Sequence, residues 1–301
     1  MMFSLLSRWQ RKGMRSDAGA SGRRSCRTAF RPRLEALEDR CVPSTLTVTN
    51  ADDDVTETHT LRWAVANAVS GDTILLTAAV KSPIVLTQGE LVLSDNVTIE
   101  SVPARTPTIS GDGISRVFEI SAGVTVSLMN LNIIDGNGVA DNSSGTAAFD
   151  GSGGAILNFG TLTVISSTLS WNSAAIFNAG SGGAIFNAGT LTVTGGSTLS
   201  DNAGFIGFGG AIFNAGTATV MGSTLSGNSA NGDGGGIYND SGGTLAISQC
   251  FVVNNSATGN GGGIFNNAAG GAVTVSDSTF CGNTPDNIFG PFTDLGGNTF
   301  C

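Results

Sequence analysis

The sequence contains few histidines, few aromatic residues, little charge and no long apolar run. Of the 301 residues, 1 is His, 7% are aromatic and 12% are charged. A single histidine leaves no pair of imidazoles for a zinc site, and no CxxC pair of cysteines is present. No stretch reaches the roughly 18 consecutive apolar residues of a membrane-spanning helix. Because hydrophobic residues still make up 40% of the chain, we expect a folded protein with a substantial core and no transmembrane segment.

Basic residues are confined to the first part of the chain, and the net charge is −9. Of the 14 Lys and Arg residues, all but four lie within residues 1–40. Those four are Arg62, Lys81, Arg105 and Arg116. Nucleic-acid binding requires cations spread over a surface, because each phosphate contact replaces a counterion. We therefore expect no nucleic-acid partner for the body of the protein.

The basic start of the chain ends in a recognisable motif. Residues 34–40 read Leu-Glu-Ala-Leu-Glu-Asp-Arg, which resembles the LExLEDR-type leader of many bacterial envelope and secreted proteins. The resemblance implies export to the cell surface or beyond. The alternative is a short amphipathic helix on a cytoplasmic protein. We interpret residues 1–43 as a basic, disordered export leader.

Residues 44–80 predict a strand, a short helix and a second strand. Four apolar residues recur at helical spacing: Leu61, Ala64, Val65 and Ala68. Thr58 or Thr60 can cap the start of this helix. The runs Thr60–Asn67 and Gly71–Ile74 resemble the entry segment of bacterial surface β-helix proteins. We expect residues 44–80 to form an N-terminal cap that covers the first turn of a repeat stack.

Internal repetition is the strongest signal in the chain. The motif Gly-Gly-(Ala/Gly)-Ile occurs at 153–156, 182–185, 209–212, 234–237 and 261–264. Each copy continues through an aromatic residue or Leu, an Asn, a short alternating run and a Ser-Thr-Leu-Ser-x-Asn piece or its variant. Three short β segments cannot bury themselves within one unit, but stacked units pair each segment with its own copy about 4.8 Å away. This pattern predicts an all-β, right-handed parallel β-helix, a pectate-lyase-like solenoid of about seven or eight coils.

Alternation along the β segments predicts which side chains enter the core. The first face contributes Ile156, Ile185, Ile212, Ile237 and Ile264. The second contributes Val164, Val193, Val220, Ile247 and Val275, and the third Leu169, Leu199, Leu225, Val252 and Phe280. Asn recurs in two columns at the corners, where it tolerates left-handed backbone geometry and can hydrogen-bond up the stack. We place the β-helix at residues 81–284 and a hydrophobic C-terminal cap at 285–301.

The repeat resembles the GGAI-type repeats of polymorphic outer-membrane proteins and related bacterial adhesins. The resemblance covers residues 150–285 and implies an extracellular or cell-envelope location and an adhesin-like role. Polysaccharide lyases and hydrolases also use this fold, so an enzyme is the alternative. A lyase base would have to come from Arg62, Lys81, Arg105 or Arg116. Asp233 and Asp240 flank one coil and are the best carboxylate pair for a hydrolase, although we favour solvated loop carboxylates. We assign no catalytic residue, no metal site and no cofactor.

One aromatic column is the candidate binding surface. Phe186, Phe213, Tyr238 and Phe265 alternate with the inward Ile column and predict either an exposed strip that stacks on sugar rings or a stack tucked into the core. Cys250 shares a column with serines and is expected to be an inward, inert thiol. Taken together, the sequence predicts a non-enzymatic, exported scaffold or binding module. The expected partner is a polysaccharide or a surface protein, and the stack ends allow self-association.

Overall fold

The computed structural model describes residues 42–102, 105–138, 151–174, 180–205, 207–267 and 270–301. Residues 42–301 form one compact unit. The predicted leader up to residue 41 lies outside the described residues, as do residues 139–150 and 175–179. The described part is an all-β parallel solenoid of about eight turns with one helix. This confirms the predicted fold class and is consistent with a right-handed coil.

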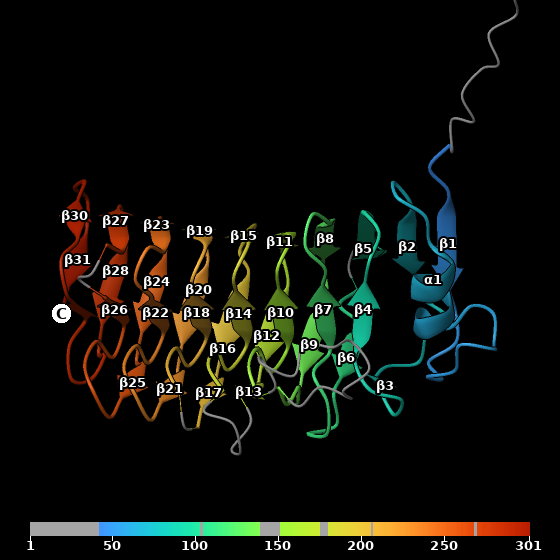
Figure 1. Ribbon diagram of the computed structural model, residues 1–301, viewed down its shortest axis with the longest axis horizontal. Helices are drawn as coiled ribbons and strands as arrows, with labels where there is room; N and C mark the ends of the chain where they lie inside the picture. The colour runs from blue at the N-terminus through green and yellow to red at the C-terminus, as the bar shows by residue number, and fades with distance from the viewer. Residues whose placement is uncertain (1–41, 103–104, 139–150, 175–179, 206, 268–269) are drawn as a thin grey trace, which may run out of the picture. The chain divides into compact units, whose positions relative to one another are not determined.

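Three long parallel sheets run along the stack, as predicted (Figure 1). The ten-stranded sheet contains β1 (Thr45–Val48), β2 (Thr73–Leu76), β5 (Val97–Ser101), β8 (Thr125–Met129), β11 (Thr161–Ile165), β15 (Thr190–Thr194), β19 (Thr217–Met221), β23 (Thr244–Ser248), β27 (Ala272–Ser276) and β30 (Thr293–Asp294). The eight-stranded sheet contains β4 (Leu91–Leu93), β7 (Phe118–Ile120), β10 (Ile156–Asn158), β14 (Ile185–Asn187), β18 (Ile212–Asn214), β22 (Ile237–Asn239), β26 (Ile264–Asn266) and β29 (Ile288–Phe289).

The third long sheet has nine strands, and a short fourth sheet accompanies it. The nine-stranded sheet contains β3 (Ile84–Val85), β6 (Thr108–Ser110), β9 (Asn132–Ile134), β12 (Thr168–Ser170), β16 (Thr198–Ser200), β20 (Thr224–Ser226), β24 (Phe251–Val253), β28 (Thr279–Cys281) and β31 (Thr299–Phe300). The four-stranded sheet, which the sequence did not predict, contains β13 (Ser173–Ala174), β17 (Ala203–Gly204), β21 (Ser229–Ala230) and β25 (Ser256–Ala257).

The pairing register places each repeat residue on its own copy. Ile156 of β10 pairs with Ile185 of β14, and Leu169 of β12 pairs with Leu199 of β16. The inward Ile, Val and Leu columns are fully or almost fully buried along their whole length, as alternation predicted. One continuous hydrophobic core therefore runs through all the turns. Its apolar contacts repeat from turn to turn, so each turn is stabilised mainly by its two neighbours.

The single helix covers the first turns of the stack. Helix α1 spans Leu61–Asn67, and the side chain of Thr60 accepts a hydrogen bond from the backbone N–H of Trp63. Of the two residues predicted as the N-cap of this helix, Thr58 and Thr60, it is therefore Thr60 that caps it. Leu61 and Ala64 are buried in the same core as the strands. The predicted strand, helix and strand of the N-terminal segment are present.

Both Asn columns form buried ladders of side-chain hydrogen bonds. In the first ladder, each Nδ2 donates to the Oδ1 one turn on, at 2.7–2.9 Å, through Asn158, Asn187, Asn214, Asn239 and Asn266. The second ladder repeats this at 2.8–3.0 Å through Asn172, Asn202, Asn228, Asn255 and Asn283. The predicted ladders are confirmed. A buried amide with all its partners avoids the cost of leaving a polar group unpaired.

The prediction that the Asn residues of the two columns adopt a left-handed backbone geometry is wrong. None of the ladder asparagines has a positive φ; in the second ladder the residue before each Asn has it instead. That column has φ values of 50–66° at Asp135, Trp171, Asp201, Gly227, Asn254 and Gly282. The reversal at the preceding residue aims the amide of the Asn into the ladder, where its hydrogen bonds are.

Residues 285–301, expected to form a C-terminal cap, form a further turn. Its strands β29, β30 and β31 each extend one of the three long sheets. A disulfide joins Cys281 to Cys301, which occupy the same position in neighbouring turns. Ile288 of this turn packs against the core, but four other apolar residues stay 39–66% exposed: Phe289, Phe292, Leu295 and Phe300. Self-association through such an end stays a prediction.

The Asn ladder provides a direct test of what holds the turns together. Replacing Asn214 by Ala removes the acceptor for Asn187 and the donor to Asn239 in the middle of the stack. We expect the free energy of unfolding of the full chain, measured in urea, to fall by about 1–3 kcal/mol. Thr219→Ala on the outer face of the same turn should cost less than about 1 kcal/mol. Equal losses for the two variants would contradict a stabilising role of the ladder.

Candidate functional site

The four predicted binding aromatics lie in consecutive strands of the eight-stranded sheet, with their rings stacked. Ring centroids are 4.9 Å apart for Phe186 and Phe213, 5.1 Å for Phe213 and Tyr238, and 5.0 Å for Tyr238 and Phe265. The rings lie within 9° of parallel. Phe289 of the last turn continues the column at 5.5 Å. The column is therefore a continuous aromatic ladder.

This ladder is neither a free strip nor part of the central core. Phe186 and Tyr238 keep only 8% of their surface exposed, whereas Phe213 and Phe265 are half-buried. None of the four belongs to the hydrophobic cluster inside the coil. Because successive rings cover each other's faces, the inner rings of the ladder present mainly their edges. Binding of a ligand to this column stays a prediction.

Tyr238 is the polar member of the ladder and lies beside both predicted carboxylates. Asn267 Nδ2 lies 3.5 Å from the Tyr238 hydroxyl and 3.4 Å from Asp240 Oδ1. Burial raises the pKa of Tyr238, and the negative charges of Asp240 and Asp233 raise it further, while the contact with Asn267 opposes the shift. The phenol therefore stays protonated at neutral pH and is no candidate base.

Each of the two carboxylates contacts an Asn residue of the next turn. Asp233 Oδ1 accepts hydrogen bonds from the backbone N–H and the side chain of Asn260, at 2.6 and 3.2 Å. Asp240 contacts Asn267 one turn on. Within the described ranges, no three side chains of His, Cys, Asp or Glu gather as metal ligands would. The geometry gives Asp233 and Asp240 a role in joining each turn to the next.

Two of the four basic residues that might have served a lyase are held in ion pairs. Arg62 Nε lies 2.6 Å from Asp53 Oδ1 and its guanidinium also donates to the carbonyls of Gly89 and Glu90. Arg116 is fully buried, 2.6 Å from Glu90 and also in an ion pair with Glu119. A buried guanidinium needs such partners to offset the loss of water. Both arginines therefore hold the first turns together.

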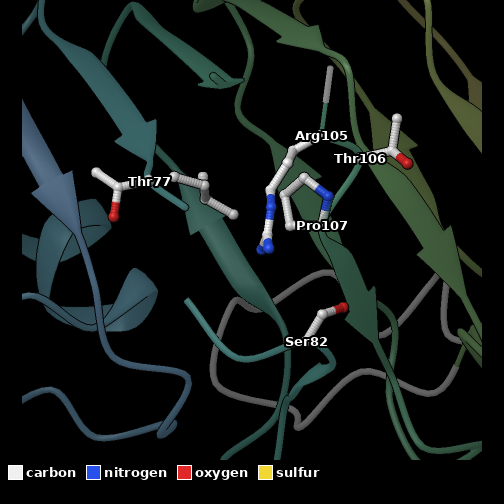
Figure 2. Close-up of a pocket in the computed structure, with 6 residues that line it drawn as sticks. Thr77, Ser82, Arg105, Thr106 and Pro107 are labelled. Carbon is white, nitrogen blue, oxygen red and sulfur yellow. The ribbon is translucent and has the colours of Figure 1, made fainter. Parts of the chain in front are cut away.

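Arg105 lines a small pocket near the start of the stack. Figure 2 shows its side chain extending alongside Pro107, with Thr77, Ser82 and Thr106 around it. The pocket holds about 240 Å³, and no carboxylate is among its lining residues. A calcium-dependent lyase would need carboxylate ligands for the ion beside its base. The Arg105 pocket does not have that composition.

Two residues noted in the sequence have local structural roles. Nδ1 of His59, the single histidine, lies 3.0 Å from the carbonyl oxygen of Thr47 and the ring is exposed. Cys250 is a free thiol that is 1% exposed, and Sγ contacts the carbonyls of Val220 and Ser248. Burial raises the pKa of this thiol. The expected inward position of Cys250 is confirmed, and a protonated, enclosed thiol is a poor nucleophile.

A concavity that the sequence analysis missed lies on the outer side of the turns that contain strands β12 to β21. It holds about 440 Å³ and is lined by Trp171, Asn172, Ser173, Asp201, Ala203, Phe205, Gly227 and Ser229. We call it the Trp171 concavity. Trp171 and Phe205 are 65% and 45% exposed. A signal for it was present in the sequence, because Trp171 stands in a column otherwise occupied by Asp, Asn and Gly.

Comparisons with known proteins add no relative to this picture. No family model, no curated protein sequence and no solved structure matches the chain. The described part contains no helix with the length and hydrophobicity needed to cross a membrane. Support for a function therefore comes from the surface of the stack.

The environment of Tyr238 can be tested by titration, because it is the only tyrosine of the chain. Tyrosinate absorbance should show a pKa above the ordinary tyrosine value. Asp240→Asn removes a nearby negative charge, which makes the phenolate easier to form, so its pKa should fall part of the way back. Asp95→Asn, in an early turn, should leave it unchanged. An ordinary pKa in the native protein, or no effect of Asp240→Asn, would show that the described environment is wrong.

Proposed function

We propose that this chain is an exported β-helix repeat protein that serves as a non-enzymatic scaffold and binding module at the cell surface. The stack supplies the scaffold, and the outer residues that vary between turns supply the binding surface. The expected partner is a polysaccharide or a surface protein. The observation that carries the binding role is the Trp171 concavity, where two large aromatic residues are exposed beside a carboxylate.

The interior of the described turns supports a structural role for most of their polar residues. Asparagines form ladders, Arg116 is neutralised in the core, and Asp233 and Asp240 bond to the following turn. These groups are engaged in holding the coil together. Exposed aromatic side chains have no such role in stability, since their burial would be favourable. Their exposure in a concave part of the surface supports contact with a ligand.

Export is supported by two independent features. Residues 34–40 resemble an export leader of bacterial envelope proteins. The Cys281–Cys301 disulfide lies at the last turn of the stack, and disulfides persist mainly in oxidising compartments outside the cytoplasm. The leader-like motif and the disulfide therefore both support an extracellular or cell-envelope location.

A binding assay with a chemical readout tests this proposal. The full chain is incubated with insoluble polysaccharides, and retained protein and released soluble fragments are both measured. We expect retention without fragments. Fragments that disappear in Asp233→Asn or Asp240→Asn would identify the enzyme alternative and overturn the proposal. Surface labelling of cells that express the tagged chain should detect it outside; a purely cytoplasmic signal would contradict export.

A further inference from the structure

The Trp171 concavity spans three successive turns. Trp171, Asp201 and Gly227 occupy the same position in these turns, directly after β12, β16 and β20. Phe205, which follows β17, contributes a second aromatic side chain to the lining. Two steps of strand spacing give the row a length of about 10 Å. The surface is thus long enough for a ligand that extends along the stack.

Trp171 carries a backbone geometry that the fold does not require of a tryptophan. Its φ is 59°, a left-handed value that is a genuine outlier for a bulky residue. At the same position, neighbouring turns use Asp, Asn or Gly, which adopt this geometry at little cost. The indole is also 65% exposed, so it adds little to the core. A strained and exposed aromatic residue points to a role in binding.

Asp201 supplies the polar side of the concavity. Its side chain is exposed, and its carboxylate accepts no hydrogen bond from any residue that the structure describes. A Cβ at Gly227 would meet Asp201 Oδ1 at 2.6 Å, so glycine at 227 leaves room for this carboxylate. Ser173 and Ser229 add hydroxyl groups to the lining. The site therefore combines an open aromatic face with one free acceptor and two hydroxyls.

The charges around the site select the ligand. No Lys or Arg follows Arg116 in the chain, so an anionic ligand would meet Asp201 without a countercharge. A wholly apolar ligand would desolvate the carboxylate without pairing it. A sugar ring has an apolar C–H face for the indole and hydroxyls for Asp201 and the serines. We propose that the Trp171 concavity is a saccharide-binding subsite for an uncharged pyranose unit, an inference that rests on the proposed binding function.

Three variants of the full chain test this assignment. Trp171→Gly introduces the residue that other turns carry at this position and that suits a positive φ, so it should fold as well as the native chain. Asp201→Asn removes the charge and keeps a residue compatible with left-handed geometry. Phe251→Thr is the control, because it removes another exposed aromatic residue and restores the threonine found at its paired positions, Thr224 and Thr279.

The assay measures retention on neutral polysaccharides (glucan, xylan, mannan), on anionic pectate and on a polylysine matrix, with the urea midpoint of each variant alongside. We expect the native chain and Phe251→Thr to be retained on at least one neutral polysaccharide. Trp171→Gly should weaken that affinity at least about tenfold, equivalent to about 1.4 kcal/mol, at an undiminished midpoint. Asp201→Asn should weaken it by a smaller factor.

The other outcomes separate failure of the site from failure of the proposed function. Native-like affinity of Trp171→Gly would overturn the saccharide subsite while leaving a binding module intact. Stronger retention on polylysine than on any polysaccharide, abolished by Trp171→Gly, would identify a site for cationic peptides and overturn the sugar assignment. Stronger retention on pectate would overturn the requirement for an uncharged ligand. No retention of the native chain on any polysaccharide would reject the polysaccharide-binding function and the subsite with it.

Discussion

The whole structure depends on in-register parallel pairing between equivalent residues of successive turns. At a strand spacing of about 4.8 Å, an inward Ile, Val or Leu always meets a residue of the same kind. The same register lets one Asn amide donate to the next, so a buried polar column has its partners inside the stack. A shift of one residue would turn every inward side chain outward and break both ladders. Apolar burial and amide hydrogen bonding therefore impose the same register.

This constraint leaves the outer surface free to vary. The residue before each Asn of the second ladder needs only a positive φ, and its side chain lies outside the ladder. Most turns fill the position with Asp, Asn or Gly, but one carries Trp171. Because the neighbouring amides are held by the ladder, the backbone there is fixed from within while its side chain faces a concavity. The stack can thus maintain a strained aromatic residue without losing the fold.

Sequence reasoning predicted what repeats and missed what occurs once. The Gly-Gly-(Ala/Gly)-Ile period and the alternation of apolar residues predicted the three long sheets, the inward columns and the Asn ladders, because each signal is repeated in several turns. The strands of the four-stranded sheet are only two residues long, too short for alternation to show. Asn generally tolerates a positive φ, which suggested that the Asn residues themselves would adopt it. Their amides are needed inside the ladder, and in the second ladder the preceding residue has the positive φ instead. The alternation of inward and outward residues also could not predict which groups would cover the faces of the aromatic rings in the column.

Features that occur once, in the last turn or on the outer surface, could not be predicted from the sequence. Cys281 and Cys301 are 20 residues apart, fewer than the 25–29 residues between the repeat motifs, so the shorter last turn hid their shared position. The Trp171 concavity combines side chains from three turns with Phe205 from a connecting loop. No spacing rule links those residues in sequence. The candidate site was therefore the part of the molecule that the sequence predicted least well.

Removal of one complete turn tests most directly whether equivalent turns build a stack whose binding surface is local. Deleting residues 237–263 joins Gly236 to Ile264 and brings Asn214 onto Asn266 in the same register. The account predicts that circular dichroism per residue, and retention on whichever polysaccharide binds the full chain, are both preserved. An unfolded or aggregated product would contradict the interchangeability of turns. A folded product that no longer binds would contradict the placement of the site at the Trp171 concavity, which the deletion leaves whole.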